Sequence, residues 1–135
     1  MEAPSPARLY AAVAGALLLV LGVAGFFYDA SFGTLDRYEE ALGAVEVNGW
    51  LNLFYVAVGS IGVLVAGVSS RTYSLIVGAL FILLAIAGWG SGWLNLVFGL
   101  LGLAAVVGTP KTKAAPKRPN PRQLKPRAKP AGKRA

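Results

Sequence analysis

The chain has 135 residues, of which 56% are hydrophobic and 14% are charged, and its formal net charge is +7. This composition is not that of an ordinary soluble domain. The chain contains no Cys and no His, which excludes disulfides, thiolate or imidazole nucleophiles, Ser-His-Asp triads and the usual zinc sites. We therefore expect a small integral membrane protein that is not an enzyme, with no catalytic residue, no cofactor and no metal.

Four uncharged apolar runs have about the length that a helix needs to cross a hydrocarbon core of ~30 Å. They cover residues 9–27, 47–69, 72–89 and 93–109 and contain no Lys, Arg, Asp or Glu. The first run could also be a signal peptide, but it exceeds the usual apolar core of ~7–15 residues and has a counterpart later in the chain. The predicted fold is all-α, with four transmembrane helices after a short N-terminus at residues 1–8.

An internal repeat groups these helices into two hairpins in tandem. A shift of 63 residues places Arg8 and Tyr10 on Arg71 and Tyr73. In the second helix of each unit, the sequence Gly-Trp-Leu-Asn at residues 49–52 recurs at residues 92–95. Because each unit contains two helices, both copies have the same orientation in the membrane, which makes this a parallel repeat.

The charges predict the orientation of the hairpins. Every Lys and Arg except Arg37 lies before the first run, between the second and third runs, or after the fourth, whereas five of the six acids lie in residues 28–46. The positive-inside rule then places both termini in the cytoplasm and makes residues 28–46 an outer loop. We expect a multi-pass protein of the inner membrane.

Aromatic and apolar side chains near the ends of the runs suggest contacts with the two interfaces. Trp50 and Trp93 open the second and fourth helices at the predicted outer interface, and Tyr10 and Tyr73 open the first and third at the inner one, where aromatic belts are found. Within the outer loop, the spacing of Leu35, Tyr38 and Leu42 predicts a short amphipathic helix over residues 34–42, capped by Thr34.

Small residues recur on one face of each helix, which permits close packing of helix backbones in lipid. The candidate packing glycines are Gly15, Gly22, Gly25, Gly59, Gly62, Gly78, Gly88 and Gly102. They would either hold the bundle together within one chain or join copies of the chain in a homo-oligomer.

Asn52 and Asn95 are the strongly polar side chains that lie well inside the runs, at equivalent positions of the repeat. A buried carboxamide requires hydrogen-bond partners, so the two residues are candidates for an interhelical polar pair. Alternatively, they line a site for a polar ligand or an ion between the repeats, as in transporters.

Residues 110–135 form a Lys/Arg/Pro-rich tail with too few apolar residues for a core, and we expect this tail to be disordered and cytoplasmic. Its positive charges would attract anionic lipids, or the tail would recruit a membrane-protein partner. Nucleic acid is not expected as a partner, because no aromatic residue is present in the tail to stack on a base. The candidate lipid contacts are Lys111, Lys113, Lys117, Arg118, Arg122, Lys125, Arg127, Lys129, Lys133 and Arg134.

The two hairpins, each with an Arg-x-Tyr start at Arg8 or Arg71 and a Trp-Leu-Asn sequence that includes Asn52 or Asn95, resemble the DUF4383 family of bacterial, mainly actinobacterial, membrane proteins. The resemblance covers residues 8–108 and implies a four-span fold and a membrane location but no chemistry. Members of that family often carry a His in this segment, whereas this chain has Asn52 and Asn95 at the corresponding positions.

The predicted function is that of a non-enzymatic structural or accessory membrane subunit, with a basic tail that binds lipid or a partner. The alternative is a small transporter or channel, acting alone or as a homo-oligomer, in which Asn52 and Asn95 line a polar path.

Overall fold

The computed structural model describes residues 3–41, 43–111 and 120. It contains four helices, α1 (Pro6–Gly25), α2 (Gly49–Val65), α3 (Ser70–Ala87) and α4 (Gly92–Val107), and two short strands, β1 (Glu39–Ala41) and β2 (Val45–Val47). The prediction of four helices is confirmed, and their ends differ from those of the apolar runs by a few residues. By length and composition, α1 and α3 could cross a membrane, whereas α2 and α4 have 17 and 16 residues.

The helix ends follow local sequence signals. Ser5 precedes Pro6, and the Ser5 hydroxyl accepts a hydrogen bond of 3.2 Å from the amide of Arg8, as expected for an N-cap before a proline. The Asn48 side chain accepts a 2.7 Å hydrogen bond from the amide of Leu51 and so caps α2. Gly88 ends α3 in the left-handed region, with a φ of 71°, where glycine pays no steric cost.

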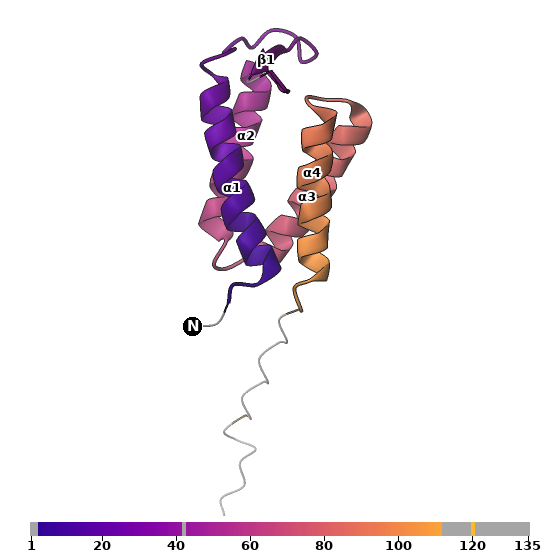
Figure 1. The fold of residues 1–135 in the computed structure, drawn as a ribbon. Helices are drawn as coiled ribbons and strands as arrows, with labels where there is room; N and C mark the ends of the chain where they lie inside the picture. The colour runs from indigo at the N-terminus through magenta and orange to yellow at the C-terminus, as the bar shows by residue number, and fades with distance from the viewer. Residues whose placement is uncertain (1–2, 42, 112–119, 121–135) are drawn as a thin grey trace, which may run out of the picture.

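Two helical hairpins stand side by side in Figure 1, with α1 packed on α2 and α3 packed on α4. Glycines let the backbones approach closely within each hairpin. A Cβ atom on Gly15 would lie 2.9 Å from the carbonyl oxygen of Gly59, and one on Gly102 would lie 2.8 Å from the Cα of Gly78. Because Gly15 and Gly78, like Gly59 and Gly102, are equivalent in the repeat, the two hairpins use the same kind of contact.

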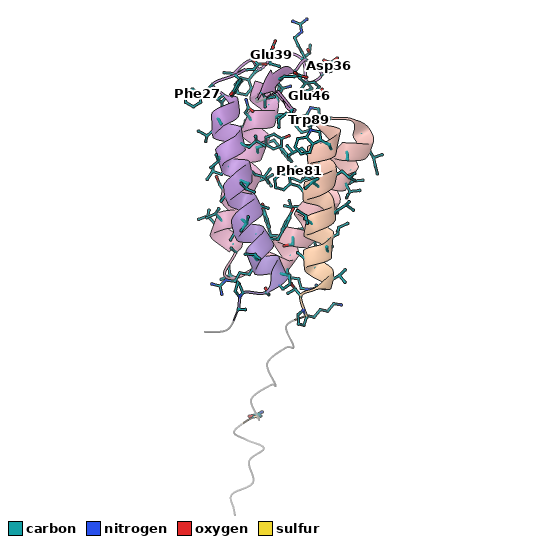
Figure 2. All side chains as sticks on the ribbon, viewed as in Figure 1. Phe27, Asp36, Glu39, Glu46, Phe81 and Trp89 are labelled. Carbon is teal, nitrogen blue, oxygen red and sulfur yellow. The ribbon has the colours of Figure 1, made fainter. Side chains whose placement is uncertain are left out.

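Aromatic side chains pack between the hairpins in the half of the bundle where α2 and α4 begin. Phe81, labelled in Figure 2, is fully buried. Its ring stacks on Tyr55 with centroids 6.5 Å apart and lies 5.5 Å from the ring of Phe98. Phe54 lies 5.7 Å from Phe81 and 5.6 Å from Trp89. The cluster joins α2, α3 and α4 through apolar contact.

The amphipathic helix predicted over residues 34–42 is wrong for the residues that are described. Residues 35–36 form a turn, and Glu39–Ala41 is a strand that pairs antiparallel with Val45–Val47, with Glu40 opposite Glu46. Gly43 lies in the turn between the strands with a φ of 70°, a conformation that favours glycine. Leu42, which the predicted helix used as an anchor, lies outside the described residues.

Residues 28–48, which we call the cap, connect α1 to α2 and extend over the ends of both hairpins (Figure 1). The connection between α3 and α4 at the same end is short, from Gly88 to Ser91. The amide of Glu46 in the cap donates a 2.7 Å hydrogen bond to the hydroxyl of Ser91, and the amide of Gly90 donates to the hydroxyl of Tyr38 at 3.2 Å. The first hairpin therefore covers the short loop of the second.

Candidate functional site

Asn52 and Asn95 are fully buried, with exposed fractions of 0% and 1%, but they do not bond to each other. The Asn52 side-chain amide donates a 2.8 Å hydrogen bond to the carbonyl of Asp29, and the Asn95 side-chain amide donates one of 2.7 Å to the carbonyl of Trp89. Each acceptor lies just beyond the end of the preceding helix, α1 or α3. The predicted interhelical pair between Asn52 and Asn95 is therefore wrong: each asparagine secures the helix end of its own hairpin.

The acceptor oxygens of both asparagines are the unusual feature of this arrangement. Neither the Oδ1 of Asn52 nor that of Asn95 has a hydrogen-bond partner within the described residues, and the hydroxyl of buried Tyr55 also has none. The Asn52 Oδ1 faces Gly25, where any Cβ atom would overlap with it. Gly25 thus provides the space that the asparagine side chain needs.

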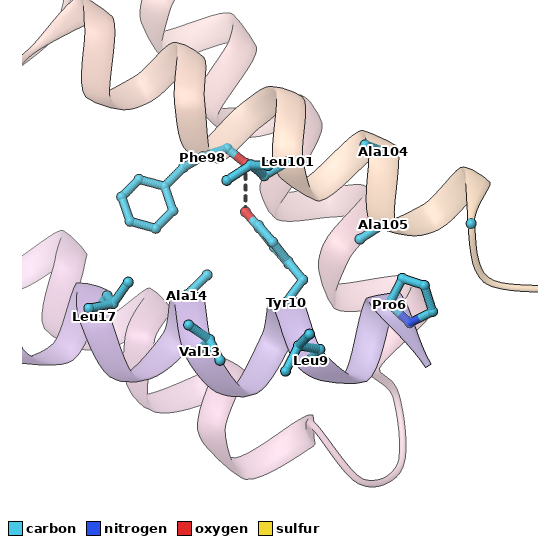
Figure 3. Close-up of a pocket in the computed structure, with 11 residues that line it drawn as sticks. Pro6, Leu9, Tyr10, Val13, Ala14, Leu17, Phe98, Leu101, Ala104 and Ala105 are labelled. Atoms are coloured by element: carbon cyan, nitrogen blue, oxygen red, sulfur yellow. Dashed lines mark hydrogen bonds between the residues drawn. The ribbon is translucent and has the colours of Figure 1, made fainter. Parts of the chain in front are cut away.

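Tyrosines join the two hairpins at the opposite end of the bundle. The hydroxyl of Tyr10 in α1 donates a 2.8 Å hydrogen bond to the carbonyl of Phe98 in α4 (Figure 3). The hydroxyl of Tyr73 in α3 donates a 2.8 Å hydrogen bond to the carbonyl of Val58 in α2. Both tyrosines are buried, so they do not form the interfacial belt that we predicted for them. The repeat placed both residues correctly as equivalents, but composition gave no indication that they would face the other hairpin.

Two apolar grooves lie at the seams between the hairpins. The groove between α1 and α4 has a volume of about 490 Å³ and includes Tyr10, Val13 and Leu17 (Figure 3). The groove between α2 and α3 has a volume of about 320 Å³ and includes the three equivalent residues of the second repeat, which are Tyr73, Ile76 and Leu80. The grooves are thus two copies of one feature. Neither of them includes Asn52 or Asn95.

The cap is held by indole groups and by Asn48. The Nε1 atoms of Trp50, Trp89 and Trp93 donate to the carbonyls of Gly33, Leu35 and Ala44 at 3.2, 3.1 and 2.9 Å. The side-chain amide of Asn48 donates to the carbonyls of Leu35 and Arg37. Sequence reasoning placed Trp50 and Trp93 at an interface and did not single out Trp89, although all three indoles donate to the cap.

The candidate packing glycines differ in their surroundings. Gly22 faces the backbone of Asn52 and Val56, and Gly62 faces the ring of Tyr73 in the other hairpin. Around Gly88, by contrast, an added Cβ atom would meet nothing within 4 Å. The prediction that Gly88 packs against another helix is therefore wrong, and its role is to end α3.

The charged candidates are described only in part. Lys111 is exposed after the end of α4, whereas the other predicted lipid contacts of the tail lie outside the described residues. Asp36, Glu39 and Glu46 lie in the cap, at the end of the bundle opposite the turn between α2 and α3 (Figure 2). Residues 3–41, 43–111 and 120 contain no group of three or more His, Cys, Asp or Glu side chains that could hold a metal ion.

Comparison with known proteins identifies the family of the chain. No curated protein and no solved structure matches it. A family model described as a domain of unknown function, DUF4383, matches residues 8–95. The matched segment runs from the Arg8 of the first repeat to the Asn95 that holds the end of α3, and thus contains both tyrosines and both asparagines of the repeat. The chain belongs to the DUF4383 family.

Proposed function

We propose that the protein is an integral membrane protein whose four helices all span the bilayer. The observation that carries this proposal is the distribution of side chains: apolar residues point outward and polar residues point inward. Leu17, Val20, Leu64, Leu83 and Ile86 are among the large apolar side chains that are more than half exposed, whereas Asn52, Ser74 and Asn95 are buried. In water such a surface would be unfavourable, but in hydrocarbon it is the expected arrangement.

The same proposal accounts for the short helices. At a rise of 1.5 Å per residue, the 17 residues of α2 and the 16 residues of α4 extend about 24–26 Å, somewhat less than the ~30 Å of a typical hydrocarbon core. Trp50 and Trp93 begin these helices with partly exposed rings, and such rings are favoured at the level of the lipid headgroups. Local thinning of the bilayer would accommodate the remaining difference at modest cost.

The proposed orientation places the cap outside the cell and both termini in the cytoplasm of a bacterial cell. The acids of the cap and the cations Arg8, Arg71 and Lys111 lie at opposite ends of the bundle, and the positive-inside rule then favours a cytoplasmic location for the cationic end.

Single cysteines test this orientation cleanly, because the natural chain contains none. We would introduce Glu40→Cys in the cap, Gly67→Cys in the turn between α2 and α3, and Lys111→Cys after α4, all at exposed positions. A maleimide that cannot cross membranes should label Glu40→Cys in intact cells and the other two variants only after permeabilisation. Labelling of all three in intact cells, or recovery of the chain in the soluble fraction, would refute the proposal.

We propose further that the protein is a non-enzymatic structural or accessory subunit of the membrane. In support, the buried polar side chains hold helices together through main-chain carbonyls, as Tyr10, Asn52, Tyr73, Ser74 and Asn95 do. In-membrane crosslinking with mass spectrometry, comparing the full chain with one ending after Thr109, tests this role. A stoichiometric protein partner captured only with the tail would support it. Catalytic turnover by the purified protein that depends on Asn52 would contradict it.

A small transporter or channel is the second candidate. In its favour, the Oδ1 atoms of Asn52 and Asn95 have no hydrogen-bond partner in the part of the chain that the structure describes. Such acceptors could contact a polar solute if the hairpins moved apart. Solute flux in proteoliposomes that disappears in the Asn52→Leu, Asn95→Leu double variant would support this function. Flux that is absent or unchanged in the double variant would count against it.

A further inference from the structure

An open cleft of about 680 Å³ lies at the tail end of the bundle, where α1 begins, α2 turns into α3, and α4 ends. Three cations line it, Arg8, Arg71 and Lys111, together with hydroxyl side chains that include those of Ser69 and Thr72. Among residues 3–41, 43–111 and 120, no carboxylate lines it. The cleft therefore combines concentrated positive charge with hydrogen-bond donors.

The two arginines are equivalent residues of the repeat, and the fold brings them to one cleft. Arg71 is half-buried, and its Nε donates a 3.2 Å hydrogen bond to the carbonyl of Thr109. This bond uses the Nε atom and not the two terminal nitrogens of the guanidinium, which can donate to another acceptor. Arg8 is exposed on the first turn of α1. Paired guanidinium groups suit phosphate, because each can donate two parallel hydrogen bonds to its oxygens.

The cleft continues into the apolar groove between α2 and α3. Ser69 and Thr72 line both the cleft and this groove. Beyond them the groove is lined by aliphatic side chains, including Val58, Ile61 and Ile76. The cationic cleft thus opens directly into the apolar groove between α2 and α3. The equivalent groove between α1 and α4 shares no lining residue with the cleft.

We propose that this composite site binds one anionic phospholipid of the cytoplasmic leaflet. Its phosphate lies in the cleft between Arg8 and Arg71, and one acyl chain lies in the groove between α2 and α3. The positive charge of the cleft favours an anionic headgroup, and the apolar lining of the groove favours an acyl chain. The proposal rests on the membrane location proposed above and adds a defined lipid site within the folded part of the chain.

Native mass spectrometry of the detergent-solubilised full chain tests the headgroup site, with phosphatidylglycerol and phosphatidylcholine as probes. We expect tighter binding of phosphatidylglycerol, and about tenfold weaker binding in the Arg8→Gln, Arg71→Gln double variant. The matched control for the single variant Arg8→Gln is Arg37→Gln, which removes one cation from the cap at the other end of the bundle and should leave that binding within about twofold. Arg8→Gln alone keeps the bond between Arg71 and Thr109 and should weaken binding in part.

A second pair of variants tests the groove. Ile76→Trp would fill the groove between α2 and α3 and should weaken phosphatidylglycerol binding about tenfold, because the indole would occupy the space of the acyl chain. Val13→Trp makes the same change at the equivalent position of the other groove and should leave binding intact. Both positions are exposed, so both variants should fold, as circular dichroism of the same samples would show.

Three results would overturn the lipid site: equal binding of the two lipids, an equal loss from Arg8→Gln and Arg37→Gln, or an equal loss from Ile76→Trp and Val13→Trp. Carbonate extraction of the same cells separates these results from a failure of the membrane proposal. A chain that stays in the membrane without preference for phosphatidylglycerol refutes only the lipid site. A chain that is released by carbonate refutes the membrane location itself.

Discussion

The rings of Tyr10 and Tyr73, which are equivalent residues of the repeat, lie against each other with centroids 6.4 Å apart. Each hydroxyl donates a hydrogen bond to the opposite hairpin, from Tyr10 to the carbonyl of Phe98 and from Tyr73 to that of Val58. The two bonds cross the same seam in opposite directions. The tyrosine of the Arg-x-Tyr sequence that begins each repeat therefore joins the two halves.

Replacing Tyr10 or Tyr73 with Phe should destabilise the bundle while leaving ring packing intact. Each variant loses one hydrogen bond between helices, which contributes about 0.6–1.7 kcal/mol in lipid. The change can be measured as a lower midpoint for SDS unfolding in mixed micelles, followed by circular dichroism. Tyr28→Phe is the control, because Tyr28 is half exposed beyond α1. A control midpoint that falls as far as those of the two variants would show that the seam bonds are not responsible.

Gly15→Ala and Gly78→Ala should each loosen one hairpin. A Cβ atom at Gly15 would lie 2.9 Å from a backbone oxygen of Gly59, and one at Gly78 would lie 2.9 Å from the backbone nitrogen of Leu103. Since backbone cannot move aside as a flexible side chain can, the helices must separate, at a cost of about 1–3 kcal/mol. The same SDS titration measures this cost. Gly67→Ala, at a position surrounded by open space, should leave the midpoint unchanged. Destabilisation by Gly67→Ala equal to that by Gly15→Ala or Gly78→Ala would contradict the prediction.

Asn52→Leu and Asn95→Leu should each lower stability by about 0.6–1.7 kcal/mol, because each removes a hydrogen bond to the carbonyl of Asp29 or Trp89. The two asparagines share no partner among the described residues, so their effects on the free energy of unfolding should add in the double variant. A double variant that is no less stable than either single variant would instead indicate that the two side chains act as one pair.

With the cap outside the cell, as proposed above, trypsin applied from that side should cleave it slowly and at one place. Arg37 is the only Lys or Arg between Arg8 and Arg71, and the neighbouring carbonyl of Leu35 is held by Asn48 and by the indole of Trp89. Trp89→Phe removes one of these bonds, so the local opening that cleavage requires should occur about fivefold more often. Mass spectrometry of right-side-out vesicles would measure the rate.

Arg37→Gln is the matched control for this experiment, since it removes the cleavage site and leaves the indole bond in place. We expect the cap of this variant to resist trypsin in the same vesicles. Cleavage rates that are equal in the natural chain and in Trp89→Phe would show that the indole does not restrain the cap.

The sequence predicted the helices well because apolar runs without charge have few alternatives to a helix. It failed in the cap, where the spacing of Leu35 and Tyr38 matched a helical period. In a helix, the carbonyl of Leu35 would accept a hydrogen bond from an amide four residues later. Here that carbonyl instead accepts from Asn48 and Trp89. Both donors lie outside the segment, so the spacing of apolar residues within it could not reveal them.

The predicted bond between Asn52 and Asn95 was wrong for a related reason. The repeat correctly made the two residues equivalent, and equivalence suggested that they meet. The nearer partners were the main-chain carbonyls that follow α1 and α3, which no longer have an amide of their own helix to accept from. In both cases the buried side-chain donor bonds to a main-chain carbonyl beyond a helix end. The identities of the side chains do not reveal where such carbonyls lie.

The crossed tyrosine bonds have a consequence for the symmetry of the fold. A single hairpin with one such tyrosine would carry a donor on its first helix and an acceptor on its second, both on the same face. Two separate copies related by a two-fold axis would satisfy each other through that face, as in an isologous dimer. The present chain holds the same pair of bonds within one molecule, so its two hairpins meet as the two copies of such a dimer would. The symmetry stops at the connections, because the one within the first hairpin forms the cap and the one within the second is short.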